Sequence, residues 1–242
     1  MTTVRFLMTW RTAAQPAVWP LLFRVGDTLE SIKQTFKVVT FDKESINWKE
    51  NVIKALVTRA SDQLSTLQEN NPMHKIYLLT FGTQSGVNLQ FTLMHKGSVA
   101  TLASALLIFK EPHITSADAI GFEMIMRVFE EIIGVTGSNL ATLSNPPTVQ
   151  EEWYYETSRR IDVYRAPNTV EWINYYGTEL CDLIGREKLE HVPVGSSRPF
   201  KDGYILTLQS KPFSYDVPQD RERQKRLHVF LELDRIHDVY SK

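Results

Sequence analysis

Cysteine and long hydrophobic runs are scarce in this chain of 242 residues. Its one cysteine, Cys181, excludes an intramolecular disulfide and a zinc site built from several cysteines. The longest largely apolar run, from Val99 to Phe109, is too short to cross a bilayer. The first residues carry Arg5 inside an apolar run and lack the cleavage site of a signal peptide. We therefore expect a cytoplasmic protein that makes no membrane contact.

A surplus of charge of either sign is also missing. The 27 basic and 28 acidic residues leave a formal net charge of −1. Nucleic-acid binding generally needs a basic surplus to neutralise phosphates, so we expect no direct binding of nucleic acid. A hydrophobic content of 43% with 23% charged residues is ordinary for a folded globular protein. The length suits one large domain or two small ones.

Motifs that carry chemistry are the third absence. The sequence has no GxSxG, SxxK or HExxH motif, and none of its six histidines are paired at the i, i+4 spacing of a helical metal site. The adjacent pairs Glu130-Glu131 and Glu151-Glu152 would point apart on a helix, which favours a solvated surface over an acid/base pair. We expect no catalytic residues, no metal site, no cofactor and no enzymatic activity.

Hydrophobic periodicity predicts the elements of the first half. Apolar residues from Trp48 to Leu67 recur every three or four residues and predict a long amphipathic helix. Alternation within residues 75–82 and 87–97 predicts an antiparallel hairpin, and residues 104–112 read as a third strand. A further apolar stripe predicts a helix from Ser116 to Gly134.

The second half repeats this mixture of strands and helices. The patterns predict a short strand at residues 160–165, a helix from Thr169 to Ile184, strands at 189–195 and 203–213, and a final helix from Asp220 to Val239. Runs of neighbouring strands followed by helices indicate an α+β fold, with antiparallel sheets and packed helices, and not alternating βαβ units.

A turn-rich stretch from Gly137 to Gln150, which contains Pro146-Pro147, marks the expected boundary between two halves. We assign residues 1–136 to an N-terminal α+β half and residues 137–242 to a C-terminal one. Both halves end in a strand pair followed by a helix, so they could be two similar α+β halves. The pattern is equally compatible with one continuous domain.

Two segments are candidates for contact with a partner. Aromatic residues gather between Trp153 and Tyr176, and Trp172 and Tyr176 share a face of the predicted helix, which favours a buried aromatic seam. For residues 151–155, which follow the proline-rich loop, burial and exposure are equally favoured. This run supplies two carboxylates and three aromatic side chains that would anchor a partner if exposed. The candidate contact residues are Glu151, Glu152, Trp153, Tyr154 and Tyr155.

The basic segment from Arg221 to His228 is interrupted by Glu222 and shares its helix with Leu227, Phe230 and Leu231. This pattern favours the charged outer face of an amphipathic helix over an RNA-binding patch.

Several segments together resemble a known family. They are VEWINYYGTELCDLIG from Val170, GYILTLQSKPFSYDVPQDRERQKRLHVFLE from Gly203, and INWKENVIKALVTRA from Ile46. A tryptophan helix ending in a tyrosine pair, a glycine-started aliphatic strand and an F-x-x-D-x-P motif before a last helix are similar to the immunity protein 52 family of bacterial polymorphic toxin and type VI secretion systems. The matching positions here are Trp172, Tyr175, Gly203, Phe213, Asp216 and Pro218.

The resemblance implies an immunity protein that binds and neutralises a cognate secreted toxin, usually a nuclease effector encoded beside it. The residues 151–155 would then be toxin-binding, since acidic side chains suit a basic nuclease cleft. Two alternatives stay open. A small hydrolase would need a cleft lined by carboxylates with raised pKa values. An adaptor subunit of a secretion machine would bind machine components without the toxin.

Overall fold

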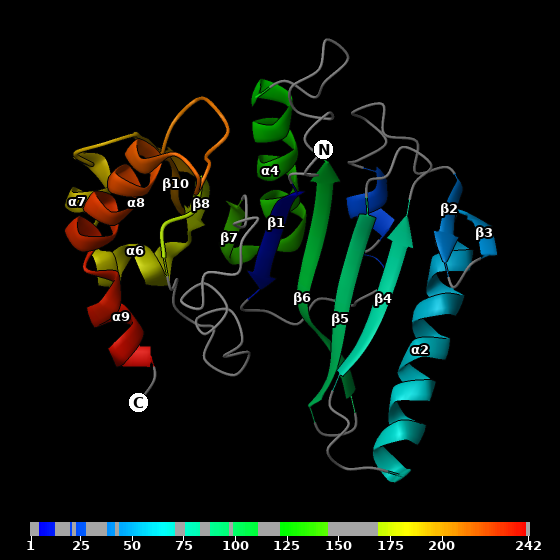
Figure 1. Cartoon of the computed structure of the whole chain (residues 1–242). Coiled ribbons are helices and arrows are strands. Elements are labelled where there is room, and N and C mark those ends of the chain that lie inside the picture. Colours follow the sequence, from blue (N-terminus) through cyan, green and yellow to red (C-terminus); the bar gives the residue numbers. More distant parts are fainter. Residues whose placement is uncertain are drawn as a thin grey trace. The chain divides into compact units, whose positions relative to one another are not determined.

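A computed structural model of the chain describes residues 5–12, 20, 23–27, 38–41, 44–70, 76–82, 88–96, 99–110, 122–144 and 169–240. Its elements form an α+β fold with antiparallel strand pairing, as the sequence predicts (Figure 1). Contacts divide the chain into two compact units, Met8–Gly137 and Ser138–Lys242, the latter joined by Met1–Leu7. The chain passes between the units twice. The first passage, after Leu7, falls within strand β1 (Arg5–Thr12), and the second, after Gly137, lies one residue from the boundary expected after 136. That the units are separate folding domains stays a prediction.

The N-terminal unit is an antiparallel sheet with two long helices. Its strands β2 (Val38–Phe41), β3 (Glu44–Asn47), β4 (Ile76–Gly82), β5 (Asn88–Lys96) and β6 (Val99–Lys110) follow the order β3-β2-β4-β5-β6. The predicted hairpin is confirmed, because β4 pairs with β5 in antiparallel register and β5 pairs with β6. The sequence reading missed β2 and β3.

The helices of this unit are α2 (Glu50–Asn70) and α4 (Phe122–Thr136). Both match predicted helices, although Ser116, the expected first residue of the second, lies outside the described residues. The apolar stripe of α2 buries Ile53, Val57 and Ala60 against β4 and β5. Before α2, the Trp48 indole packs edge-on against Phe81 at a centroid distance of 5.1 Å.

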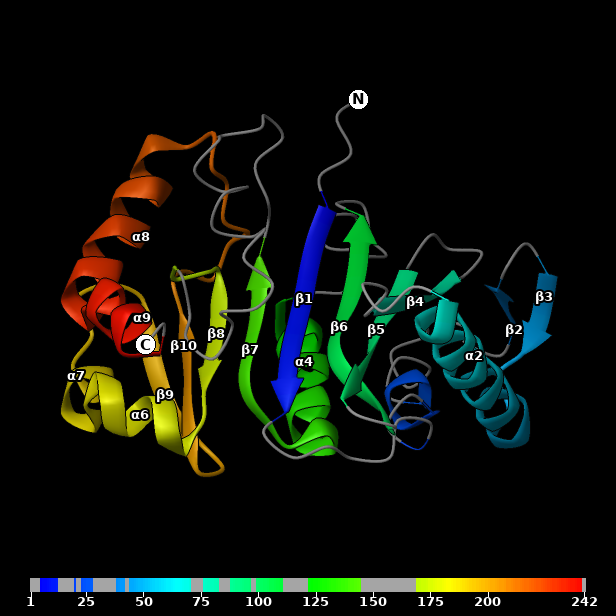
Figure 2. The ribbon, with the colours of Figure 1, turned by 90° about the horizontal axis from the view of Figure 1, so that it is seen from below.

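The C-terminal unit also holds an antiparallel sheet, in the order β7-β8-β10-β9. Its strands are β7 (Ser138–Ser144), β8 (Ile173–Tyr176), β9 (Ser196–Phe200) and β10 (Gly203–Thr207). Four helices, α6 (Thr178–Ile184), α7 (Arg186–Glu190), α8 (Pro218–Leu231) and α9 (Leu233–Tyr240), lie together on one side of β8, β9 and β10 (Figures 1 and 2). A Cβ added to Gly203 would lie 2.1 Å from the Tyr176 carbonyl oxygen, so the close approach of β10 to its antiparallel partner β8 requires glycine at this position.

Several predictions for this unit are wrong. The expected helix from Thr169 to Ile184 is a buried strand, β8, followed by the short helix α6. All four residues of β8 are buried, so both faces of the strand are covered. Its sequence therefore shows no alternation of apolar and polar residues, and the spacing of its apolar residues resembles that of a helix. The stretch after Gly137 begins with strand β7 and not a turn.

The segment expected as a strand at residues 189–195 ends α7 and then bends, and the strand β9 follows it. The last predicted helix is interrupted at Glu232, whose backbone is left-handed with φ of 54°, so it forms α8 and α9. Among the described residues, no helix is long and apolar enough to cross a membrane.

Candidate functional site: helix α8 and the polar cluster beneath it

The five residues expected to contact a toxin, Glu151, Glu152, Trp153, Tyr154 and Tyr155, lie outside the described part of the chain. Their role therefore stays a prediction. Within the described part, the polar side chains that stand out gather around α8, on its buried side and on its exposed side.

The start of α8 is fixed by a buried carboxylate. Pro218 occupies its first turn, where a missing N–H costs nothing, and Val217 before it is extended and gives no side-chain cap. Asp220 is 7% exposed, and its Oδ2 atom accepts hydrogen bonds from the Ser214 backbone N–H and the Gln209 amide, each 3.0 Å long. These bonds hold the segment before α8 against its first turn.

The buried face of α8 continues from Asp220 through Gln224, Leu227 and Leu231, at the spacing of one helical stripe. The Gln224 side-chain amide donates to the Val170 carbonyl at 2.7 Å and to the Tyr215 hydroxyl at 3.1 Å. Leu227 and Leu231 are fully buried. Apolar packing and directional hydrogen bonds together fix the orientation of α8 within its unit.

The opposite face of α8 is open to solvent. Glu222, Lys225, Arg226 and Val229 are exposed there, and 65% of the Val229 surface is accessible. The charged run therefore forms the outer face of an amphipathic helix, which confirms the interpretation drawn from the sequence. The sequence did not reveal that Asp220 and Gln224 belong to the buried face, although both share the stripe of Leu227 and Leu231.

Beneath α8 lies a buried carboxyl, Glu171, which is 8% exposed. The Asn174 side chain clamps its backbone, accepting from the Glu171 N–H and donating to the Glu171 carbonyl at 2.8 Å each. Burial raises the pKa of the Glu171 carboxyl to about 7, opposed by a hydrogen bond from Tyr215. Among the described residues, its Oε2 atom and the buried Tyr176 hydroxyl find no hydrogen-bond partner.

The described aromatic residues close to Glu171 in the chain, which are Trp172, Tyr175 and Tyr176, belong to the core. Trp172 and Tyr176 are fully buried, as the predicted seam requires, but they lie before and in strand β8 and not on a helix. The Trp172 indole N–H donates to the Gln209 carbonyl at 2.8 Å. Cys181 is also buried, its thiol donates to the Tyr176 carbonyl at 3.0 Å, and burial raises its pKa to about 11. This thiol is structural, as expected.

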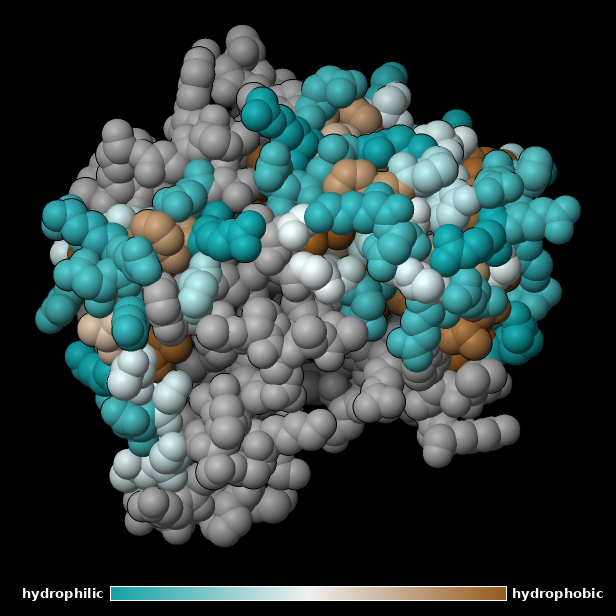
Figure 3. Space-filling view, turned by 180° about the vertical axis from the view of Figure 1, so that it is seen from behind, coloured by the Kyte–Doolittle hydropathy of each residue, from teal (hydrophilic) through white to brown (hydrophobic). Residues whose placement is uncertain are grey.

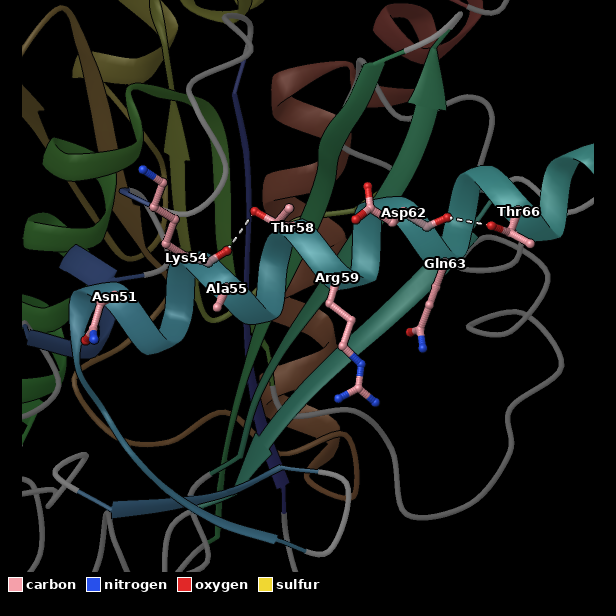
Figure 4. Close-up of a pocket in the computed structure, with 8 residues that line it drawn as sticks. All are labelled: Asn51, Lys54, Ala55, Thr58, Arg59, Asp62, Gln63 and Thr66. Carbon is pink, nitrogen blue, oxygen red and sulfur yellow. Dashed lines mark hydrogen bonds between the residues drawn. The ribbon is translucent and has the colours of Figure 1, made fainter.

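Hollows also border the described residues, and two of them are informative. One of about 960 Å³ is lined by eight residues of α2, between Asn51 and Thr66. Figure 4 shows that their side chains do not converge, since Lys54 and Arg59 point to different sides of the helix. The hydroxyls of Thr58 and Thr66 donate hydrogen bonds to backbone carbonyls of the same helix, at 3.0 and 3.1 Å. This surface has the ordinary chemistry of an exposed helix.

The second hollow, of about 490 Å³, lies where β9 begins and β10 ends, beside Arg223 of α8. Arg223 donates there to the Gln209 side-chain oxygen at 2.7 Å. Glu171, whose carboxyl has a raised pKa, lines neither of these hollows. The described residues hold no group of three potential metal ligands. On the face that Figure 3 shows, the coloured residues are mostly hydrophilic, with small separate hydrophobic areas.

Comparison with known proteins gives one informative result. No protein-family model matches the chain, and no curated protein matches it. Among solved structures, the chain is similar to the Pseudomonas aeruginosa T6SS (type VI secretion system) protein PA0821, with a TM-score of 0.56 and 12% sequence identity. The match covers 95% of this chain and 72% of that one. The chain thus shares an overall fold with a T6SS protein.

Proposed function

We propose that the chain is a non-enzymatic immunity protein that binds and neutralises a toxin of a type VI secretion system. The observation that carries the proposal is the fold similarity to a T6SS protein over 95% of the chain. The sequence motifs that resemble the immunity protein 52 family agree with this proposal, although no protein-family model matches the chain. We further propose that the toxin is a nuclease effector and that the protein acts in the cytoplasm, where a nuclease reaches nucleic acid.

The C-terminal unit has features that suit protein binding. Its helix α8 is held by hydrogen bonds from Asp220 and Gln224 and by buried leucines, so its outer face is presented in one orientation. Preorganised surfaces bind with a smaller loss of conformational entropy. The residues 151–155 would supply a second contact, with carboxylates directed at the basic cleft of a nuclease.

An adaptor subunit of the secretion machine is the second candidate, because the fold similarity is to a T6SS protein whose name does not specify immunity. The two functions differ in what the protein binds. An immunity protein binds the toxin by itself, whereas an adaptor associates with machine components when the toxin is missing.

Co-expression tests the proposal. The toxin candidate is the protein encoded next to the gene for this chain, produced in a bacterial host with and without the chain. We expect growth arrest by the toxin alone, rescue by co-expression, and a complex of the two on size-exclusion chromatography. Arrest that co-expression fails to relieve would contradict immunity, and stable capture of machine components by the chain alone would favour the adaptor.

A further inference from the structure

We propose that residues 208–217, which join β10 to α8, open and close with the protonation of Glu171. In the closed form Tyr215 covers the neutral Glu171 carboxyl. In the open form the segment moves away and lets water reach the ionised carboxylate. The structure shows the closed form, in which Tyr215 is 4% exposed. This device does not depend on what the chain binds, so it goes beyond the proposed function.

The segment is held in place by side chains, since it forms neither helix nor strand. The Tyr215 hydroxyl accepts a hydrogen bond from the Gln224 amide at 3.1 Å and donates one to the Glu171 carboxyl. The Tyr215 ring packs edge-on against the buried Phe213 ring at a centroid distance of 4.8 Å. Segments without a backbone ladder open at a lower free energy than paired strands do. Residues 208–217 can therefore open while β8 and β10 stay folded.

The Glu171 carboxyl is buried without a compensating positive charge among the described residues. On α8, the Asp220 carboxylate and the Arg223 guanidinium are both bonded to the Gln209 side chain. Burial raises the pKa of Glu171 to about 7, and the hydrogen bond from Tyr215 opposes this rise. A buried carboxylate without a cation is unfavourable, and contact with water removes that penalty. Ionisation of Glu171 therefore favours any state in which water reaches it.

The groups on the other side of Glu171 cannot relieve the charge either. Tyr176 of β8 is fully buried, and burial together with the charge of Glu171 raises the pKa of its hydroxyl. Burial raises the pKa of the Cys181 thiol to about 11, so both groups stay neutral near pH 7. Glu171 itself is fixed, because the Asn174 side chain bonds to its backbone N–H and carbonyl at 2.8 Å each. The part that moves is therefore the cover, which carries Tyr215.

Native-state amide hydrogen exchange of the purified full chain tests this inference. It is measured by NMR from pH 5 to pH 8, with and without low urea, and corrected for the intrinsic pH dependence of exchange. Urea separates local opening from global unfolding, because it promotes only openings that expose much surface. The reporter is Ser214, whose N–H donates to the Asp220 carboxylate at 3.0 Å. The reference amides are those of β10, which is paired on both sides.

We expect the Ser214 amide to be protected at least about tenfold less than the β10 amides, with no response to low urea. Its protection should fall about seventyfold from pH 5 to pH 8, since the carboxyl pKa is about 7 when covered and 4.5 when exposed. Glu171→Gln should abolish this fall, and the exposed control Glu179→Gln should keep it. Tyr215→Phe should lower the protection of Ser214 about fivefold already at pH 5, because it removes the hydroxyl that bonds to Glu171 and Gln224.

Equal protection and equal urea dependence of Ser214 and the β10 amides would show that the segment does not open by itself, and would overturn the inference. A local opening that does not change with pH, or whose pH dependence survives in Glu171→Gln, would also overturn it. The carbon-13 shift of the Glu171 carboxyl needs no variant: a midpoint above pH 6 supports the inference, and one near 4.5 contradicts it. None of these results bears on toxin binding, so the proposed function is tested separately.

Discussion

The substitution Glu171→Gln should remove a pH dependence of folding stability that the wild type shows between about pH 4.5 and pH 7. Gln keeps the shape of the side chain and can accept the hydrogen bond from Tyr215, but it does not ionise. In the folded protein, burial raises the pKa of Glu171 from 4.5 to about 7. The folded state therefore holds the Glu171 proton more tightly than the unfolded state does.

The sign and size of this change in unfolding free energy follow from the difference between the folded and unfolded pKa of Glu171. Because the folded pKa is raised, the stabilisation is fully present below about pH 4.5 and is lost as pH rises through about 7. A difference of about 2.5 pKa units corresponds to about 3 kcal/mol, at roughly 1.4 kcal/mol per unit. The free energy of unfolding of the wild type should fall by about that amount over this range, relative to the variant.

The assay is urea denaturation at several pH values from 4.5 to 8, comparing Glu171→Gln with the wild type and with the exposed control Glu179→Gln. The difference in unfolding free energy between the Glu171 variant and the wild type should grow by about 3 kcal/mol in favour of the variant as pH rises. A constant offset in stability, from burying the new amide group, would not alter this trend. Parallel pH profiles for Glu171→Gln and the wild type would refute the reasoning.

Three further predictions concern other parts of the chain. Trp153→Ala should weaken toxin binding by at least about 2 kcal/mol, roughly thirtyfold, with an unchanged melting temperature; a lower melting temperature with intact binding would place Trp153 in the core. Gly203→Ala should lower the unfolding free energy by about 3 kcal/mol, measured by denaturant titration, because the new Cβ would collide with the Tyr176 carbonyl oxygen. The control Gly137→Ala should cost about 1 kcal/mol, because Gly137 has a φ of 58° but open space around it. Elemental analysis of the purified protein should find no stoichiometric transition metal, and one tightly held ion per chain would contradict this expectation.

The sequence predicted the elements whose hydrophobic pattern has a single period. Helix α2 shows an uninterrupted stripe with period 3.6, and the β4–β5 hairpin alternates cleanly, because each buries one face. Strand β8 was mistaken for a helix because it is buried on both faces. A signal for its end was present in Gly177, which gives way to α6 and where an added Cβ would lie 2.9 Å from the Asn139 Cα.

Strand β9 was missed for a different reason. Two serines and Pro199 are typical of a loop, but proline is tolerated in a strand that ends a sheet, and β9 is the last in the order β7-β8-β10-β9. The cluster around Glu171 could not be predicted, because Tyr215, which bonds to Glu171, and Gln224, which bonds to Tyr215, lie more than 40 residues further along the chain. Only the tertiary fold brings them together and removes water from the carboxyl.

The measurement that tests the central claim most directly is a titration of the toxin encoded next to the gene with the purified chain, following both the heat of binding and the toxin's nuclease activity. We predict a one-to-one complex with a Kd on the order of nanomolar, as for other specific protein complexes of standard size, and loss of nuclease activity that is complete at equimolar protein. Absence of binding heat, with nuclease activity unchanged in an excess of the chain, would contradict the account.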